Sequence, residues 1–142
     1  MFQRILLPVD GTAVSEKAVP YAMELARANG SEVVVFRVIT TPAGPHSATE
    51  ELHATEYVER VANRFRAAGL PVKTQISRGE APTEIRKAAL RWNADVIVMA
   101  TRGRRRLEKL MLGSVADAVV RDSRLPVLLV CAKQQARKRA AA

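Results

Sequence analysis

Five short apolar runs, separated by segments of helical periodicity, constrain the fold of this chain more than any other feature of its sequence. Three of them, Glu32–Ile39, Asp95–Ala100 and Pro126–Ala132, are rich in β-branched residues and nearly continuous. Continuous apolar runs of this length are typical of strands that are covered on both faces of a parallel sheet. Arg4–Val9 is predicted to be another strand. Pro71–Ser77, in which apolar and polar residues alternate, is predicted to lie near an edge of the sheet.

The segment between the first two runs is predicted to form a helix. Thr12 is placed to cap its start, and Gly30 marks its end. Because Pro20 has no N–H to donate, we expect it to bend this helix or to remove one of its backbone hydrogen bonds. The residues at helical spacing in this segment are Val14, Ala18, Tyr21, Ala22 and Leu25.

Three further helices are predicted from the same periodicity. The second covers about Thr49–Ala68 and ends at Gly69 and Pro71, the third covers about Pro82–Trp92, and the fourth begins near Gly113–Ser114. Their predicted core residues are Leu52, Val58, Val61, Ala62 and Phe65 in the second, Ile85, Ala89 and Trp92 in the third, and Val115, Val119 and Val120 in the fourth.

These elements alternate as βαβαβαβαβ in a chain of 142 residues, which is the length of one domain. Short, right-handed connections then give an α/β fold with an open, doubly wound parallel sheet and helices on both faces. The longest irregular segment, Thr40–Thr49, is predicted to be a surface loop rather than a domain boundary. In such folds ligands bind outside the carboxyl ends of the strands, where the strand order reverses. We therefore expect the loops after Val9 and Ala100 to meet at a binding site.

The positive charge of the chain is concentrated in its last third. Residues 1–100 hold 12 Lys/Arg and 11 Asp/Glu, whereas residues 101–142 hold 11 Lys/Arg and 3 Asp/Glu. This asymmetry indicates a localised anionic partner. Nucleic acid is disfavoured as that partner, because no aromatic residue follows Trp92 and the basic region therefore lacks a stacking surface. Part of the charge lies in residues 133–142, which are predicted to be a disordered tail.

Small and charged residues around the fourth predicted helix suggest a phosphate site. Gly103 allows a close approach of the backbone to an anion, and Gly113 and Ser114 lie at a helix start, where free N–H groups favour phosphate. Arg102 can pair with a phosphate, and Asp10 can accept a hydrogen bond from a ligand. The same residues also have ordinary explanations: a helix cap at Ser114, a solvated arginine run, and a turn ordered by Asp10.

The sequence offers little support for other kinds of site. The pattern G-x-x-x-x-G-K-S/T is absent, and no G-x-G-x-x-G follows the first strand. His46 and His53 lie in or beside the surface loop, with no evident nucleophile or metal-ligand partner. Cys131, the single cysteine, is predicted to be a buried apolar residue. No apolar stretch is long enough to span a bilayer and no signal-peptide pattern is present, so we expect a cytoplasmic protein without a membrane partner.

Four stretches resemble, in order, the landmarks of the universal stress protein (UspA-like) family: ILLPVDGTAVSEKAVPYAMELA, GEAPTEI, ADVIVMATRGRRRLEKLMLGSVADAVVR and LPVLLV. The resemblance extends to about Val130. It implies a Rossmann-like fold of the adenine nucleotide alpha hydrolase type, with five parallel strands in the order 3-2-1-4-5. It also implies a domain over residues 1–132 and a homodimer formed through the last strand, Pro126–Cys131, which would cover an exposed sheet edge.

The ATP-binding branch of this family carries G-x-x-G, nine further residues, and then G-S/T. Here Gly103 matches the second glycine and Gly113–Ser114 closes the motif, but Ala100 stands at the first glycine. Arg102 stands where the family usually has histidine. The resemblance implies an adenosine pocket of Pro8, Val9, Asp10, Val38 and Met99, and a phosphate site of Gly103, Gly113, Ser114 and Val115, to which Ala100 and Arg102 are adjacent.

Two functions follow from this resemblance. The first is a switch or sensor that binds ATP, alone or with Mg²⁺, or another adenine nucleotide, and that hydrolyses it slowly at most. The second is a dimeric interaction module without nucleotide, as in the non-binding branch of the family. The methyl group of Ala100, where the binding branch has glycine, is the reason to retain the second.

Overall fold

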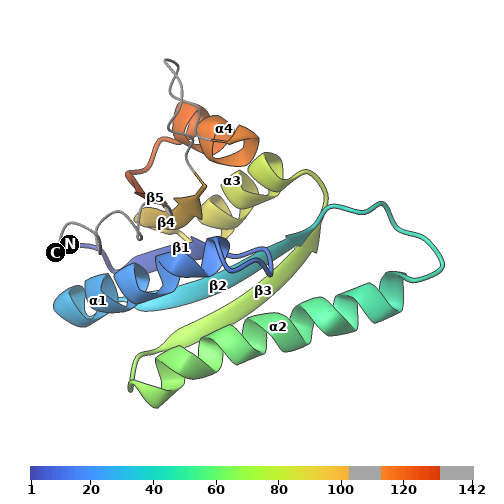
Figure 1. The fold of residues 1–142 in the computed structure, drawn as a ribbon. Coiled ribbons are helices and arrows are strands. Elements are labelled where there is room, and N and C mark those ends of the chain that lie inside the picture. The colour runs from blue at the N-terminus through green and yellow to red at the C-terminus, as the bar shows by residue number, and fades with distance from the viewer. Residues whose placement is uncertain (103–112, 132–142) are drawn as a thin grey trace, which may run out of the picture.

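Five parallel strands form the centre of the protein, in the order β3-β2-β1-β4-β5 (Figure 1). The computed structural model describes residues 1–102 and 113–131 of the chain. The strands are β1 (Arg4–Pro8), β2 (Glu32–Ile39), β3 (Val72–Arg78), β4 (Val96–Thr101) and β5 (Val127–Cys131). The chain builds the sheet outward from β1 in one direction and then returns to place β4 on the other side of β1. The predicted fold and strand order are therefore confirmed.

Four α-helices connect the strands and cover both faces of the sheet (Figure 1). They are α1 (Val19–Asn29), α2 (Ser47–Ala67), α3 (Ala81–Arg91) and α4 (Ser114–Asp122), and a short 3-10 helix, η1 (Ser15–Ala18), precedes α1. Helices α1 and α2 pack on one face, whereas α3 and α4 pack on the other. Among the described residues, no helix is both long and apolar enough to cross a membrane.

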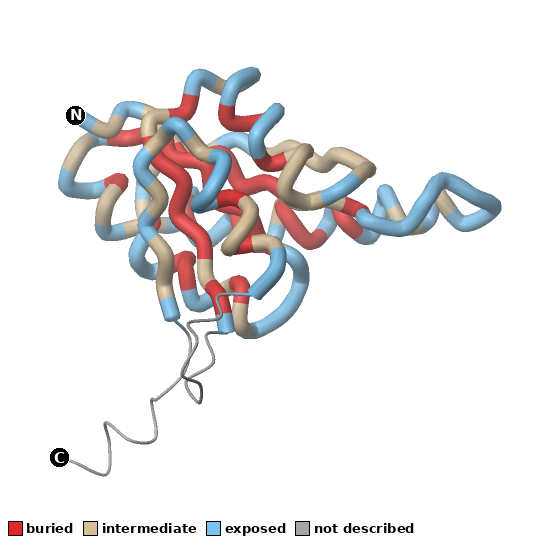
Figure 2. The backbone as a smooth tube through the Cα atoms, turned by 90° about the horizontal axis from the view of Figure 1, so that it is seen from above, coloured by how far each residue is buried: buried red, intermediate tan, exposed pale blue. Residues whose placement is uncertain are grey.

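The central strands are buried on both sides, which explains their continuous apolar sequences. Leu7 and Val35 face α1 and α2, whereas Leu6 and Phe36 face α3 and α4, and all four side chains are fully buried. Figure 2 shows the buried residues running through the middle of the molecule, with exposed residues around them. The apolar surface buried in these two layers is the main favourable contribution to the folding free energy.

The strand β3 lies at an edge of the sheet, as its alternating sequence predicts. Its polar side chains pair with residues of the flanking helices and of the segment after α3. The Thr74 hydroxyl donates a hydrogen bond to the Glu59 carboxylate on α2 (2.8 Å), and the Trp92 indole N–H donates to Oε1 of the Gln75 side chain. Trp92 is half-buried rather than a core residue, because this hydrogen bond holds its polar edge at the side of β3.

The first predicted helix differs from expectation at its start. It divides into η1 and α1, and Pro20 lies in the first turn of α1, where a missing N–H leaves no hydrogen bond unmade and no bend is required. Thr12 does not cap α1, but its hydroxyl accepts a hydrogen bond from the Ser15 N–H at the start of η1 (3.1 Å). Tyr21 is exposed. Gly30 ends α1 in the left-handed conformation (φ 67°), as predicted.

Several predicted core residues lie at the surface. Leu52 is 56% exposed, because the first turns of α2 extend past the strands (Figure 1). Val120 is 43% exposed, since α4 turns Ala116 and Val119 toward α3 and the sheet, and Val115 is only half-buried. The strand β5 is an edge strand that is only partly covered, which leaves Cys131 exposed rather than buried. Periodicity predicts that one face of an element is apolar, but not how far neighbouring elements reach to cover it.

Candidate functional site

A cavity of about 680 Å³ opens at the carboxyl ends of β1, β2 and β4. Its wall is formed by the turn after β1, the end of β2 and the following loop, the first turns of α2 and α3, the end of β4, and the start of α4. This is the place where the strand order reverses, and its volume lies within the range of about 300–1,000 Å³ that is typical of small-molecule sites.

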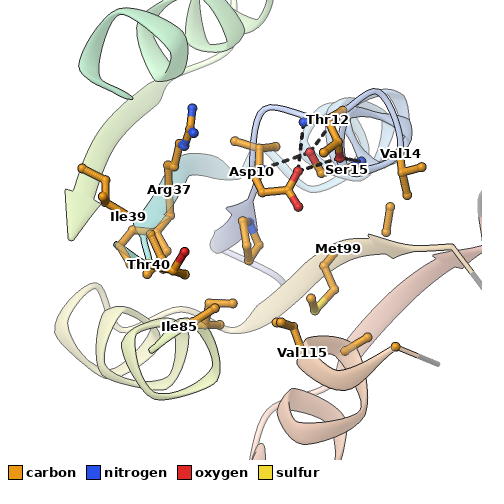
Figure 3. Close-up of a pocket in the computed structure, with 18 of the residues that line it drawn as sticks. Asp10, Thr12, Val14, Ser15, Arg37, Ile39, Thr40, Ile85, Met99 and Val115 are labelled. Carbon is orange, nitrogen blue, oxygen red and sulfur yellow. Dashed lines mark hydrogen bonds between the residues drawn. The ribbon is translucent and has the colours of Figure 1, made fainter. Parts of the chain in front are cut away.

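The predicted site residues meet in this cavity. Gly103 lies outside the described residues, and every other predicted residue lines the cavity wall. In Figure 3, Asp10 lies on one side of the cavity, with Met99 and Val115 facing it from β4 and α4. The lining residues that were predicted are Pro8, Val9, Asp10, Val38, Met99, Ala100, Arg102, Gly113, Ser114 and Val115.

The turn that carries Asp10 is held by a set of short hydrogen bonds (Figure 3). Oδ1 of Asp10 accepts hydrogen bonds from the Thr12 N–H (2.9 Å) and from the Thr12 hydroxyl (2.6 Å). The N–H of Asp10 donates to the Ser15 hydroxyl (3.0 Å), which itself donates to the Thr12 carbonyl (3.0 Å). Gly11 adopts φ 89°, a conformation that favours glycine. Asp10 therefore orders this turn, whatever it contacts in the cavity.

The same contacts influence the ionisation of Asp10. Partial burial alone would raise the pKa of its carboxyl group. The hydrogen bonds from Thr12, the nearby Ser15 hydroxyl and the positive charge of Arg37 outweigh this effect and hold the pKa below its usual value. Asp10 therefore presents a carboxylate, which only accepts hydrogen bonds, to the cavity at neutral pH.

The start of α4 presents backbone donors on another part of the wall. Gly113 is the N-cap residue, with φ 92° and no side chain to supply a cap. The Asp117 N–H donates to the Gly113 carbonyl (3.0 Å), which is the first hydrogen bond within the helix. The N–H groups of Ser114, Val115 and Ala116 come before it and therefore have no acceptor within the helix. The Ser114 hydroxyl forms no hydrogen bond with the described residues, and it is not the cap. Free donors and the helix dipole make this a suitable place for an anion.

The universal stress protein family model matches residues 1–130. The chain belongs to the universal stress protein family. It is 31% identical over 140 residues to universal stress protein MJ0531 of Methanocaldococcus jannaschii, a match that covers 92% of this chain and 82% of the relative. The solved structure of MJ0577 from the same organism superposes with a TM-score of 0.77 at 28% identity and covers 95% of this chain and 99% of its own.

Two solved universal stress proteins contain nucleotides. One, in complex with cAMP, matches with a TM-score of 0.69 and 23% identity over 93% of this chain and 98% of its own. Another, from Archaeoglobus fulgidus in complex with dAMP, matches with a TM-score of 0.69 and 20% identity over 92% and 98%. At 23% and 20% identity, these two structures show that the fold is shared.

Ala100 is the departure from the glycine pattern, and the structure shows where its methyl group lies. Ala100 follows Val96 and Val98 on the face of β4 that packs with α1 and α2, and it contacts that core cluster. Met99 faces the opposite side and packs with the cluster under α3 and α4. Ala100 therefore contacts the core cluster and lines the cavity at the same time.

Several lining residues of this universal stress protein were not predicted from the sequence. They include Arg37 at the end of β2 and His53 on α2, which is exposed as expected but reaches the cavity rim. A signal for Arg37 was present, since it is the only charged residue between Val33 and Ile39 in an otherwise apolar strand. The other unpredicted lining residues include Phe36, Ile39, Thr40, Thr41, Glu50, Ala54, Ala81, Ile85 and Thr101.

The cavity combines three kinds of surface. Val38, Ile85 and Met99 supply apolar contacts, Asp10 supplies an acceptor, and the start of α4 supplies donors. Such a combination suits a ligand with a flat apolar part, hydroxyl or amino donors, and an anionic group. Within residues 1–102 and 113–131, no cluster of three or more His, Cys, Asp or Glu residues is arranged to hold a metal ion.

Proposed function

We propose that this universal stress protein binds an adenine nucleotide, with ATP as the favoured ligand, in the cavity at the carboxyl ends of β1, β2 and β4. The observation that carries the proposal is the meeting of the Asp10 turn and the start of α4 in one cavity. They are far apart in the sequence and supply acceptors and donors of the kinds that a nucleoside and a phosphate require. The family members solved with cAMP and dAMP support an adenine nucleotide as the ligand class.

The nucleoside would occupy the side of the cavity near β1 and β2. Pro8, Val9 and Val38 would pack against the adenine ring with Met99, and the Asp10 carboxylate would accept a hydrogen bond from a ribose hydroxyl or from the adenine amino group.

The phosphates would lie at the start of α4. The Ser114 and Val115 N–H groups and the Ser114 hydroxyl would donate to phosphate oxygens, and Arg102 would add positive charge at the rim. Gly103 and Gly113 would keep side chains away from the phosphates. A Mg²⁺ ion would enter with the phosphates, because such ions keep several waters and bind through the nucleotide as much as through protein.

We further propose that the protein acts as a switch or sensor rather than as an efficient enzyme. Among the described residues of the cavity wall, no histidine forms a hydrogen bond with a serine or cysteine, and the Ser15 hydroxyl beside Asp10 donates to the Thr12 carbonyl. Nucleotide binding would then report on the supply of adenine nucleotide by changing the surface around the cavity. Any hydrolysis of ATP would be slow.

Calorimetric titration of nucleotide-free protein with ATP and with adenosine tests the proposal. We expect both to bind, and ATP to bind more tightly, because only ATP reaches the donors of α4. Absence of heat at millimolar ATP would refute nucleotide binding. The second candidate, a dimeric interaction module, is retained because Ala100 replaces a glycine of the binding motif. Heat-denaturing the purified protein and finding no adenine absorbance in the supernatant, together with a null titration, would favour it.

A further inference from the structure

Among the described residues, Arg37 is a cation of the cavity wall that forms no ion pair, although its charge acts on the Asp10 carboxylate. It lies at the carboxyl end of β2, between the buried residue Phe36 and the half-buried Val38. Its Nε atom is buried without a hydrogen-bond partner, and within residues 1–102 and 113–131 its guanidinium forms no ion pair. Leaving a buried donor without a hydrogen bond destabilises the folded state, because the N–H has lost its water and gained no acceptor. An arginine in this position therefore calls for an explanation beyond packing.

Two neighbours hold the guanidinium in place. Its Cζ atom lies 5.1 Å from the centroid of the Tyr57 ring, the distance of a cation–π contact. On the side of the turn after β1, a Cβ atom added to Gly11 would lie 3.3 Å from Nη1 of Arg37. Arg37 thus contacts helix α2 and lies directly beside the turn that carries Asp10. A glycine at position 11 gives it the room to do so.

The Tyr57 ring is itself fixed to the other end of that turn. The Tyr57 hydroxyl donates a hydrogen bond to the Glu16 carboxylate on η1 (2.7 Å), and Arg64 on α2 pairs with the same carboxylate (3.3 Å). Burial and the neighbouring Glu16 raise the pKa of Tyr57 to about 12, so the phenol remains a neutral donor at physiological pH. Helix α2, η1 and the end of β2 are therefore linked around the Asp10 turn.

We propose that Arg37 is a positioning residue of the nucleotide site, which joins the turn that carries Asp10 to Tyr57 on α2 and so holds this turn in the place that the nucleoside requires. The proposal rests on the proposed function. Figure 3 shows Arg37 leaving the sheet beside Asp10, with its guanidinium directed away from Met99 and Val115. This direction places it at the nucleoside side of the cavity, away from the start of α4.

Comparing ATP with adenosine distinguishes the two roles that Arg37 could have in the cavity. A residue that acts through Asp10 affects every ligand with a nucleoside, whereas a residue that pairs with phosphate affects ATP and leaves adenosine unchanged. The other ionisable side chains among the described residues of the cavity wall are Glu50 and His53 on α2 and Arg102 after β4, and Glu16 on η1 lies beside the turn that carries Asp10. The ionisation of Asp10 is best followed directly at its own carboxyl carbon, because that signal reports on this group alone.

Arg37→Met tests the proposal, with Arg60→Met as a matched control. Arg60 also stacks on the Tyr57 ring, at 5.7 Å, but it is exposed on α2 and does not line the cavity. We expect Arg37→Met to weaken the binding of ATP and of adenosine by the same factor, about tenfold for a disturbed charge-assisted hydrogen bond, and Arg60→Met to weaken neither. Arg37→Lys keeps the charge but loses the planar stack, and it should recover part of the affinity.

Carbon-detected NMR titration of the Asp10 carboxyl in the nucleotide-free protein provides an independent measurement. We expect its pKa to rise in Arg37→Met and to stay in place in Arg60→Met and Arg37→Lys. An unchanged Asp10 pKa in Arg37→Met, or a loss of ATP binding with adenosine binding intact, would overturn the proposal. If the unaltered protein binds neither ligand, the proposed function fails, and the Asp10 titration still decides whether Arg37 controls this carboxylate.

Discussion

Oδ1 of Asp10 accepts two hydrogen bonds from a single residue, Thr12, one from its hydroxyl at 2.6 Å and one from its N–H at 2.9 Å. Both bonds engage the same oxygen, so Thr12 leaves Oδ2 unoccupied. The turn after β1 thus fixes the carboxylate through one oxygen and presents the other to the cavity. A fixed acceptor of this kind loses little conformational entropy when a ligand binds.

Replacing Thr12 by valine tests this arrangement, because valine keeps the shape and removes the hydroxyl. We expect Thr12→Val to lower the free energy of unfolding at pH 7 by about 1–2 kcal/mol, because the hydroxyl donates one hydrogen bond to Asp10 and accepts another from the Ser15 N–H. Asp10 has a lowered pKa in the folded protein, so its contribution to stability is present above the unfolded-state pKa and is lost as the pH falls through the folded-state pKa. Urea unfolding at pH 7 and at acidic pH should show a smaller acid loss in the variant. An equal acid loss in both proteins would contradict the role of Thr12.

The start of α4 is best tested at Ser114 rather than at Gly113. Any side chain at Gly113 is strained by its φ of 92°, and a Cβ there would lie 3.3 Å from the Thr101 hydroxyl, so Gly113→Ala strains the local backbone as well as altering the site. Ser114→Ala removes only a hydroxyl that has no partner among the described residues. We expect it to weaken ATP binding about fivefold to tenfold and to leave adenosine binding unchanged in calorimetric titrations. Equal losses for both ligands would remove Ser114 from the phosphate site.

The two halves of the cavity could be predicted from the sequence for a physical reason. Parallel strands bring their carboxyl ends to one edge, so the loops after β1 and β4 had to meet once the strands were recognised. Arg37 was missed because its neighbours, Gly11 and Tyr57, belong to elements that periodicity cannot orient relative to one another. The exposure of Leu52 has a similar origin, since it depends on how far α2 extends beyond the sheet.

Ala100→Gly tests whether the methyl group interferes with the ligand. Because the methyl packs against the core cluster of α1 and α2, we expect nucleotide affinity to change by less than about twofold, which is under about 0.4 kcal/mol. The variant should instead lose about 0.5–1 kcal/mol of unfolding free energy, since glycine adds chain entropy to the unfolded state. Titration with ATP and thermal unfolding measure the two quantities separately. A tenfold gain in ATP affinity would show that the methyl group crowds the nucleotide.

The contact between Tyr57 and Glu16 can be tested at alkaline pH, through the ionisation of the Tyr57 hydroxyl. Because the pKa of Tyr57 is raised to about 12, its contribution to stability is complete below the unfolded-state value of about 10 and is lost as the pH rises toward 12. The chain has two tyrosines, so ultraviolet titration should resolve a tyrosinate component near pH 12 that is missing in Tyr57→Phe. We also expect Tyr57→Phe to lose about 1–2 kcal/mol at pH 7, because the hydrogen bond to the Glu16 carboxylate is removed while the ring remains under Arg37. A late component that persists in the variant would show that the raised pKa does not belong to Tyr57.

The edge strand β5 provides the test of dimerisation. We propose that two copies associate through Pro126–Cys131, because β5 is an edge strand among the described residues and its Leu128 side chain is 42% exposed. A lysine on an edge strand opposes such pairing through its charge, so Leu128→Lys should convert the dimer to monomer in sedimentation-velocity experiments. Leu90→Lys is the matched control, since Leu90 is 75% exposed on α3 and lies outside β5. A monomeric unaltered protein, or dissociation caused by Leu90→Lys but not by Leu128→Lys, would exclude β5 as the interface.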